Sequence, residues 1–354
     1  MNLKLNNYGI LYPKYGIFKR VENWDIFMIN IGETMKHVFI INPNAGRKGK
    51  LEKFCNKIKQ SAERLGIDYE LYFTKGPKDC GKHARELCME MAAGGEKLRI
   101  YGCGGDGTVN ELVNGVIGFE NVEIGVIPMG TGNDYIRNYG DPDDFRDIES
   151  QIKGIARTSD LIKYRAEYNG EVTEAYCANM FNIGFDCNVV DATDRLKQLP
   201  LINGSLAYLL GVAAMFIKKK GADLKIEFED GTVKDGPILL CAVANGCFCG
   251  GGIKSAPESI LDDGLMDVTI IDNVTRRFFL SVFPSFKKGE HLQMKKVIDS
   301  GKIKYIKEKA LTITANGESL KLCIDGEITI QKRVEFSIVE DAVRFIVPAK
   351  IAGK

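Results

Sequence analysis

The sequence shows no excess of charge of either sign, since 48 lysines and arginines stand against 47 aspartates and glutamates in 354 residues. The chain as a whole is therefore not a polyelectrolyte binder, and any attraction to phosphates or anionic lipids must come from local patches. Histidine is scarce, and His37, His83 and His291 are too scattered for a zinc site. The ten cysteines lack the spacing of a disulfide framework, so we expect reduced thiols in a cytosolic protein.

No run of apolar residues is long enough to span a bilayer. The longest run, residues 205–217, is followed by three lysines. As a helix it would reach about 20 Å, against a hydrocarbon core of about 30 Å. The first residues also lack the basic and apolar regions of a secretory signal. If the protein acts on lipid, we expect it to do so from the aqueous side.

Residues 36–157 are predicted to form an α/β domain. Apolar strand-like runs, glycine-containing turns and amphipathic helical stretches alternate there, which favours a parallel sheet covered by helices. The preceding residues 1–35 fit either an upstream extension or a small hairpin. At the other end of the chain, residues 346–354 are expected to return to this first domain.

A second, β-rich domain is predicted over residues 158–345. Short strand-like runs dominate this region, and Asn-Gly and Asp-Gly pairs separate several of them. Such pairs are hairpin signals, so we expect mostly antiparallel strands. Helices are expected to interrupt them near residues 204–220 and 275–287.

Three polar, glycine-bearing turns follow strands of the predicted parallel sheet, at residues 42–46, 104–108 and 130–134. Glycine lets a phosphate approach the backbone closely, and the helix after the second turn offers its N-terminal N–H groups to an anion. Asp106 would repel a bare phosphate, but it makes sense if it holds Mg²⁺; the alternative is an ordinary tight turn. Because parallel strands end at one edge, the turns predict a nucleotide pocket there. It is neither a dinucleotide fingerprint nor a Walker A loop.

Two acidic segments stand out in the second region. Residues 261–267 read Leu-Asp-Asp-Gly-Leu-Met-Asp, and residues 323–327 read Cys-Ile-Asp-Gly-Glu. Asp-Gly is a common turn pair, so either segment taken alone also fits a β-turn.

The run over residues 101–111, Tyr-Gly-Cys-Gly-Gly-Asp-Gly-Thr-Val-Asn-Glu, resembles the signature loop of the diacylglycerol kinase catalytic family. Four more segments follow that family's order, at residues 40–46, 127–134, 244–268 and 325–327. The resemblance covers about residues 37–345. It implies an α/β nucleotide-binding domain with a parallel sheet, followed by an antiparallel β-sandwich domain as in NAD kinases. ATP and substrate would lie in the cleft between the two.

The resemblance also implies site residues. The ATP site would be lined by Asn42, Pro43, Asn44, Ala45, Gly46, Thr74, Gly104, Gly105, Asp106, Gly107, Thr108, Val109, Asn110 and Thr131. Asp106 would help to organise the catalytic Mg²⁺, and Glu327 would be the general base, with Asp325 in the same polar network. Bacterial members also carry a second, structural Mg²⁺. For that ion Asp263 would supply a carboxylate, and Ile260 and Leu265 would supply backbone carbonyls.

The function implied by this resemblance is transfer of the γ-phosphate of ATP to the hydroxyl of a membrane lipid, with diacylglycerol giving phosphatidic acid. Ceramide, sphingoid bases, monoacylglycerol and polyprenols present a similar hydroxyl and stay open as acceptors. NAD kinase shares the Gly-Gly-Asp-Gly-Thr loop and is the enzymatic alternative. A catalytically silent lipid-binding module is the alternative of a different class, although every acidic motif is retained.

A basic segment suggests how the chain reaches lipid. Residues 276–309 contain ten lysines and arginines and three acidic residues. Cations and rings alternate at its start, where Arg276, Arg277, Lys287 and Lys288 are interleaved with Phe278, Phe279, Phe283 and Phe286. This pattern fits either a peripheral membrane surface on the inner face of the membrane or a helix with core-facing rings and solvated cations. No nucleic-acid motif accompanies the charge, and a homodimer is an open expectation.

Overall fold

The computed structural model describes residues 35–353 except 46–48, 50, 95–96, 131, 186 and 188–220. Before residue 35 it describes four two-residue strands, which pair antiparallel as β1 (Lys4–Leu5) with β2 (Leu11–Tyr12) and β3 (Ile17–Phe18) with β4 (Met28–Ile29). The helix expected near residues 204–220 lies outside the described residues.

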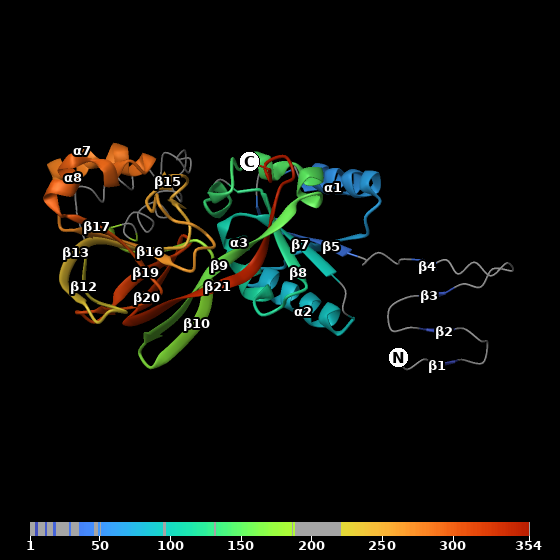
Figure 1. Cartoon of the computed structure of the whole chain (residues 1–354), viewed down its shortest axis with the longest axis horizontal. Helices are drawn as coiled ribbons and strands as arrows, with labels where there is room; N and C mark the ends of the chain where they lie inside the picture. Colours follow the sequence, from blue (N-terminus) through green and yellow to red (C-terminus); the bar gives the residue numbers. More distant parts are fainter. Residues whose placement is uncertain are drawn as a thin grey trace.

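Four parallel strands form the first half of the main sheet (Figure 1). They are β5 (Met35–Ile41), β6 (Tyr69–Phe73), β7 (Lys97–Gly104) and β8 (Val122–Pro128), in the order β6-β5-β7-β8. The connecting helices are α1 (Leu51–Leu65), α2 (Asp79–Gly94) and α3 (Asp106–Val116). Both faces of this sheet are covered, which explains why its strands are almost continuously apolar.

Alternate side chains of these strands enter two different cores. On β7, Leu98 and Ile100 pack in one core with residues of α2 and α3, whereas Tyr101 and Cys103 pack in a second core beneath α1. The second core is completed by the short helix α4 (Ile148–Ile152), which contacts α1. The parallel sheet predicted from the sequence is thus confirmed.

The second half of the chain is built from antiparallel strands. They are β9 (Ile155–Tyr168), β10 (Glu171–Cys177), β11 (Met180–Gly184), β12 (Ala222–Phe228), β13 (Val233–Ala244), β16 (Met266–Asp272), β17 (Ile303–Glu308), β18 (Ala310–Ala315), β19 (Leu320–Ile324), β20 (Glu327–Gln331) and β21 (Arg333–Val347). A separate short pair joins β14 (Phe248–Cys249) to β15 (Ile253–Lys254). One apolar layer lies inside the curved sheet, and another lies between the sheet and helices α7 (Arg276–Lys288) and α8 (Lys295–Ser300).

The two halves share one sheet. Strand β21 pairs antiparallel with β9 along most of its length and parallel with β8 through Phe345 and Ile124. Phe345 and Ile351 then pack in the core of the first half. Because β9 and β21 run through both halves (Figure 1), the domain boundaries drawn from the sequence stay a prediction.

The signature run is divided between a strand and a helix. Strand β7 continues through Gly104, and α3 begins at Asp106, so only Gly105 lies between them. The loop expected over residues 104–108 is therefore mostly the first turn of a helix. Within the described residues, no helix has both the length and the apolar character needed to cross a membrane.

Candidate active site

The turns after β5, β7 and β8 lie side by side at the carboxyl edge of the parallel sheet. The Asn42 amide donates to the Cys103 carbonyl at 3.1 Å, and the Met129 amide donates to the Gly104 carbonyl at 2.8 Å. Thr74, which follows β6, joins the same edge because its amide donates to the Ile41 carbonyl at 2.9 Å. The edge predicted to hold a nucleotide is thus assembled from four consecutive strand ends.

The N-terminus of α3 is open at this edge. Gly105 precedes the helix with an extended backbone, and no side chain caps the helix N-terminus. The first N–H groups of a helix have no partner within it and carry a partial positive charge. A Cβ placed on Gly105 would meet no atom within 4 Å, and one on Gly107 would meet only Glu327 Oε1, at 3.9 Å. These amides can therefore receive an anion beside the Glu327 carboxylate.

Asp106 ties α3 to the turn after β8. Its Oδ1 accepts hydrogen bonds from the amides of Asp134, at 2.8 Å, and Tyr135, at 3.3 Å. Gly132 lies close to the other carboxylate oxygen, since a Cβ added at position 132 would lie 2.6 Å from Asp106 Oδ2. Burial, and then the charge of Asp134, raise the pKa of Asp106 to about 6. A nearby cation would stabilise its ionised form.

Asp134 adds a buried carboxylate to this edge, whereas the sequence pattern indicates it only as the end of a turn. Its Oδ2 accepts from the amide of Gly251 at 2.8 Å, and Arg137 Nε lies 3.5 Å from its Oδ1. Burial raises its pKa. The loop around Gly251, between β14 and β15, belongs to the second half of the chain, so Asp134 links the two halves. The sequence signal that could have identified Asp134 was its position at the end of the glycine-bearing turn, residues 130–134, at the edge of the sheet.

Asp325 lies within a tight hairpin turn of the second half, and Glu327 directly follows that turn. Residues Asp325 and Gly326 connect β19 to β20, and their φ angles of 45° and 97° are both left-handed. Asp-Gly suits a two-residue turn of this kind because both central positions need positive φ. The turn alternative for this segment is therefore correct. It also brings two carboxylates to the N-terminus of α3.

The Asp325 carboxylate is turned inward. Its Oδ1 accepts from the Met180 amide at 3.1 Å, and its Oδ2 accepts from the Cys177 thiol at 3.2 Å. Burial raises the pKa of Asp325 to about 7, and the charges of Asp106 and Asp134 add to the increase. The same enclosure raises the pKa of Cys177 well above its ordinary value, which keeps it a donor.

Carboxylates from both halves thus gather around one helix N-terminus, and such an arrangement favours a cation. Within the described residues, no three His, Cys, Asp or Glu side chains form a preassembled metal cage. Mg²⁺ is commonly held by one or two carboxylates together with substrate phosphates and waters. The partly buried Asp106 and the buried Asp134, both with raised pKa values, fit a Mg²⁺ ion that arrives with a nucleotide.

The predicted structural metal site has a different neighbour. Lys307 Nζ lies 2.8 Å from Asp263 Oδ2 and 3.2 Å from Oδ2 of the buried Asp267. Asp263 Oδ1 accepts from the amide of Leu265 at 3.2 Å. The Lys307 ammonium therefore offsets only one of these two negative charges, and the metal assignment of Asp263 stays a prediction. Ile260, predicted to contribute a carbonyl, is a half-exposed neighbour in the same loop.

The remaining predicted nucleotide residues divide into three groups. Asn42, Pro43, Asn44 and Ala45 form the turn after β5, where the Asn44 amide donates to Asn42 Oδ1 at 3.0 Å. Val109 and Thr108 are buried, so Val109 can offer a ligand only its backbone. The Oδ1 of Asn110 already accepts a hydrogen bond from Asn114 Nδ2. Gly46 and Thr131 lie outside the described residues.

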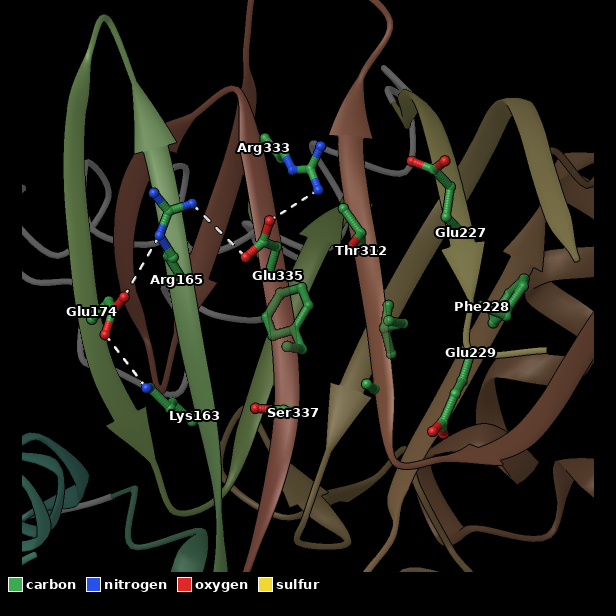
Figure 2. Close-up of a pocket in the computed structure, with 13 residues that line it drawn as sticks. Lys163, Arg165, Glu174, Glu227, Phe228, Glu229, Thr312, Arg333, Glu335 and Ser337 are labelled. Carbon is green, nitrogen blue, oxygen red and sulfur yellow. Dashed lines mark hydrogen bonds and ion pairs between the residues drawn. The ribbon is translucent and has the colours of Figure 1, made fainter. Parts of the chain in front are cut away.

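A second concave surface, on β9, β10, β18 and β21, carries balanced charges (Figure 2). Glu174 lies between Lys163, at 3.4 Å, and Arg165, at 3.6 Å. Glu335 lies between Arg165, at 3.8 Å, and Arg333, at 2.9 Å. Because each of these charges has an opposite neighbour, we assign no ligand to this surface.

Two family models match the chain. The diacylglycerol kinase catalytic domain matches residues 36–164, and the YegS C-terminal NAD kinase beta sandwich-like domain matches residues 179–347. A crystal structure of a diacylglycerol kinase from Bacillus anthracis has the same fold, with a TM-score of 0.63 and 21% identity. The match covers 89% of this chain and 98% of that one.

Curated relatives carry the same name. The diacylglycerol kinase of Bacillus subtilis is 31% identical over 298 residues, which cover 83% of this chain and 90% of the relative. That of Staphylococcus carnosus is 26% identical over 315 residues, which cover 88% of this chain and 95% of the relative. The carboxylates and the open helix N-terminus described above thus lie in a chain that belongs to the diacylglycerol kinase catalytic family of lipid kinases.

Proposed function

We propose that the protein transfers the γ-phosphate of ATP to the hydroxyl of diacylglycerol, giving phosphatidic acid and ADP. The observation that carries this proposal is the position of Glu327, whose carboxylate stands beside the uncovered first turn of α3. A phosphate held at that helix end would lie between backbone donors and a proton acceptor. Family membership supplies the lipid acceptor and ATP as the donor.

The nucleotide phosphates are held by the edge of the parallel sheet. The N–H groups of α3 face them, and the glycines at 105 and 107 leave room for their approach. Asp106 and Asp134 would hold Mg²⁺, which neutralises phosphate charge when it is bound. Asp106 is positioned for this by the amides of Asp134 and Tyr135.

Glu327 serves as the general base. The lipid hydroxyl oxygen attacks the γ-phosphorus, its proton passes to the Glu327 carboxylate, and the bond from phosphorus to the bridging oxygen of ADP breaks. A positioned base of this kind contributes about 10²–10⁴-fold to the rate. Asp325 holds the turn that carries Glu327, through its bonds to Met180 and Cys177.

A Glu327→Gln variant tests the assignment. Glutamine keeps the size of the side chain and removes the proton acceptor, so ATP binding should persist while turnover falls about 10²-fold or more. Turnover can be followed by thin-layer analysis of radiolabelled product, and nucleotide binding by titration calorimetry. The partly exposed Glu335→Gln, on the surface in Figure 2, is the matched control. Normal turnover by the Glu327 variant would remove the base from the mechanism.

The acceptor is tested in the same assay. Diacylglycerol, monoacylglycerol, ceramide, a sphingoid base, a polyprenol and NAD are offered side by side with ATP and Mg²⁺. We expect the highest kcat/KM with diacylglycerol. A preference for another lipid alcohol would change the substrate and keep the mechanism, whereas phosphorylation of NAD alone would contradict both. The proposal also includes peripheral association with the inner face of a membrane, where the substrate lies, and a homodimer as the state to test by sedimentation.

A further inference from the structure

Helix α7 packs its aromatic side chains inward. Val282 is 4% exposed and Phe286 is 8% exposed, and both belong to the apolar layer between the helix and the sheet. Phe278, Phe279 and Phe283 are partly buried and line a narrow apolar pocket over β13 and β16. Of the two alternatives for this segment, the helix with core-facing rings and solvated cations is therefore correct. The phenylalanine rings do not face outward.

The opposite face of α7 is exposed and basic. A helix of 3.6 residues per turn places one set of residues on a single outward stripe. These residues, here named the α7 outer face, are Arg276, Arg277, Leu280, Pro284, Lys287 and Lys288. Leu280 is 58% exposed at the centre of the stripe. On the neighbouring α8, Ile298 is 65% exposed, beside the exposed Lys295 and Lys296 and the exposed Asp299.

The arginines of this face are not explained by helix stability. Arg276 and Arg277 occupy the first turn, which contains no acidic residue. Cations near a helix N-terminus are disfavoured by the helix dipole, whereas Lys287 and Lys288 in the last turn are favoured by it. Among the ion pairs of the described residues, none joins Arg277, Lys287 or Lys288 to a carboxylate. Their charge is therefore available to an outside partner.

The α7 outer face is connected to the active site through β15. Gly289, which directly follows α7, lies against β15, since a Cβ at this position would lie 2.8 Å from the side chain of Lys254. The loop between β14 and β15 contains Gly251, whose amide donates to Asp134 at 2.8 Å. Figure 1 shows α7 at the outer edge of the molecule, directly beside β15. The C-terminal end of α7 thus packs against the β14–β15 pair whose loop borders Asp134.

We propose that the α7 outer face docks on an anionic lipid bilayer and presents the active site to a substrate in that bilayer. This inference rests on the proposed function, because it supplies the surface by which a lipid kinase reaches its lipid. Cations of the stripe would face phosphate headgroups, while Leu280 and Pro284 would enter the interfacial layer. Charge complementarity selects a bilayer with anionic lipids over a neutral one.

The test removes charge from this face and measures binding to vesicles. The variant Arg277→Gln/Lys287→Gln/Lys288→Gln loses three cations without touching the packed face of α7. The control Lys59→Gln/Lys82→Gln/Lys309→Gln loses three exposed cations on other elements. Partition is measured by co-sedimentation with phosphatidylglycerol–phosphatidylcholine vesicles and with pure phosphatidylcholine vesicles, without ATP.

We expect the α7 variant to bind anionic vesicles roughly 100-fold more weakly than wild type, with the difference shrinking at high salt. The control should bind within a few-fold of wild type. Leu280→Ser should weaken binding roughly tenfold, at all salt concentrations. Equal partition of the α7 variant and wild type would overturn the proposal. Equal binding of wild type to anionic and neutral vesicles would overturn it as well.

A water-soluble, short-chain diacylglycerol separates this proposal from the proposed function. The α7 variant should phosphorylate it at the wild-type rate, and lose rate only with vesicle-borne substrate. Failure of wild type to phosphorylate the soluble substrate would contradict the proposed function, whatever the vesicle binding. Equal rates of the α7 variant and wild type on vesicle-borne substrate would contradict the docking surface alone.

Discussion

Replacing Asp325 by asparagine should make the protein more stable and less active. Burial raises the pKa of Asp325 from an ordinary 3.8 to about 7. Between these two pH values the folded protein holds a proton that the unfolded chain releases. The free energy of unfolding therefore falls as pH rises through this window, by about 1.4 kcal/mol for each pH unit. Above pH 7 both states are ionised and the loss is complete.

The magnitude follows from the width of the window. From 3.8 to about 7 the loss sums to about 4 kcal/mol at pH 8, of which about 1.5 kcal/mol is already present at pH 5. Asparagine does not titrate, so the variant avoids this loss. It can still accept from the Met180 amide, and it tolerates the left-handed φ of 45° found at this position. The advantage of Asp325→Asn should grow by about 2.5 kcal/mol between pH 5 and pH 8.

Urea unfolding of wild type and variant at pH 5, 6, 7 and 8 measures this difference. The exposed Asp68→Asn serves as the control and should change stability by less than about 0.5 kcal/mol at every pH. Kinase turnover is measured on the same samples, and we expect it to fall for Asp325→Asn. A stability difference that is independent of pH, or a variant less stable than wild type at pH 8, would refute the assigned environment of this carboxylate.

The remaining predictions concern its neighbours. Gly132→Ala should lower turnover at least tenfold, because its Cβ would lie 2.6 Å from Asp106 Oδ2. The control Gly317→Ala, whose Cβ would meet no atom within 4 Å, should leave turnover unchanged. Equal activities of the two variants would show that the loop around Gly132 can shift to accommodate the methyl group. Cys177→Ala removes a donor that favours the ionised form of Asp325, so the acidic limb of the pH–rate profile should move to higher pH, and an unmoved limb would exclude this role. Lys307→Met leaves Asp267 buried without its cation and should cost about 2–3 kcal/mol in urea unfolding. Chelation by EDTA should leave the wild-type melting temperature unchanged if Lys307 is the counter-ion, and should lower it if Asp263 holds a metal.

The sequence predicted the fold well where one physical signal dominated. Strands β18 and β19 lie in the region predicted to be rich in antiparallel strands, and the Asn-Gly pair between them is one of its hairpin signals. Strand β21 continues to Val347, beyond the end of the predicted second domain at residue 345. Its last residues pair with β9 and β8, and such a long-range pairing leaves no local mark in the sequence. The sequence predicted a loop where α3 begins at Asp106, because glycine at positions 105 and 107 usually indicates a loop. In the structure these glycines instead leave the N-terminus of the helix open.

The candidate site was predicted unevenly for a related reason. Motif order named Asp106, Asp325 and Glu327, and the structure places the first near the other two. Motif order did not single out Asp134 or Cys177, because the importance of these two residues lies in contacts between segments far apart in the chain. It also could not foresee Lys307 beside Asp263, since those residues meet only through the pairing of β16 with β17.

The hairpin at Asp325 and Gly326 shows why structural and functional interpretations of a motif need not compete. A two-residue turn with positive φ at both positions favours Asp-Gly on conformational grounds alone. The same turn forces the residues on either side of Gly326 to leave the hairpin in different directions. Asp325 therefore turns inward to the Met180 amide, while Glu327 begins β20 facing Gly107 of α3. Any substitution that relaxes the turn should thus lower activity through the position of Glu327, even where both carboxylates are retained.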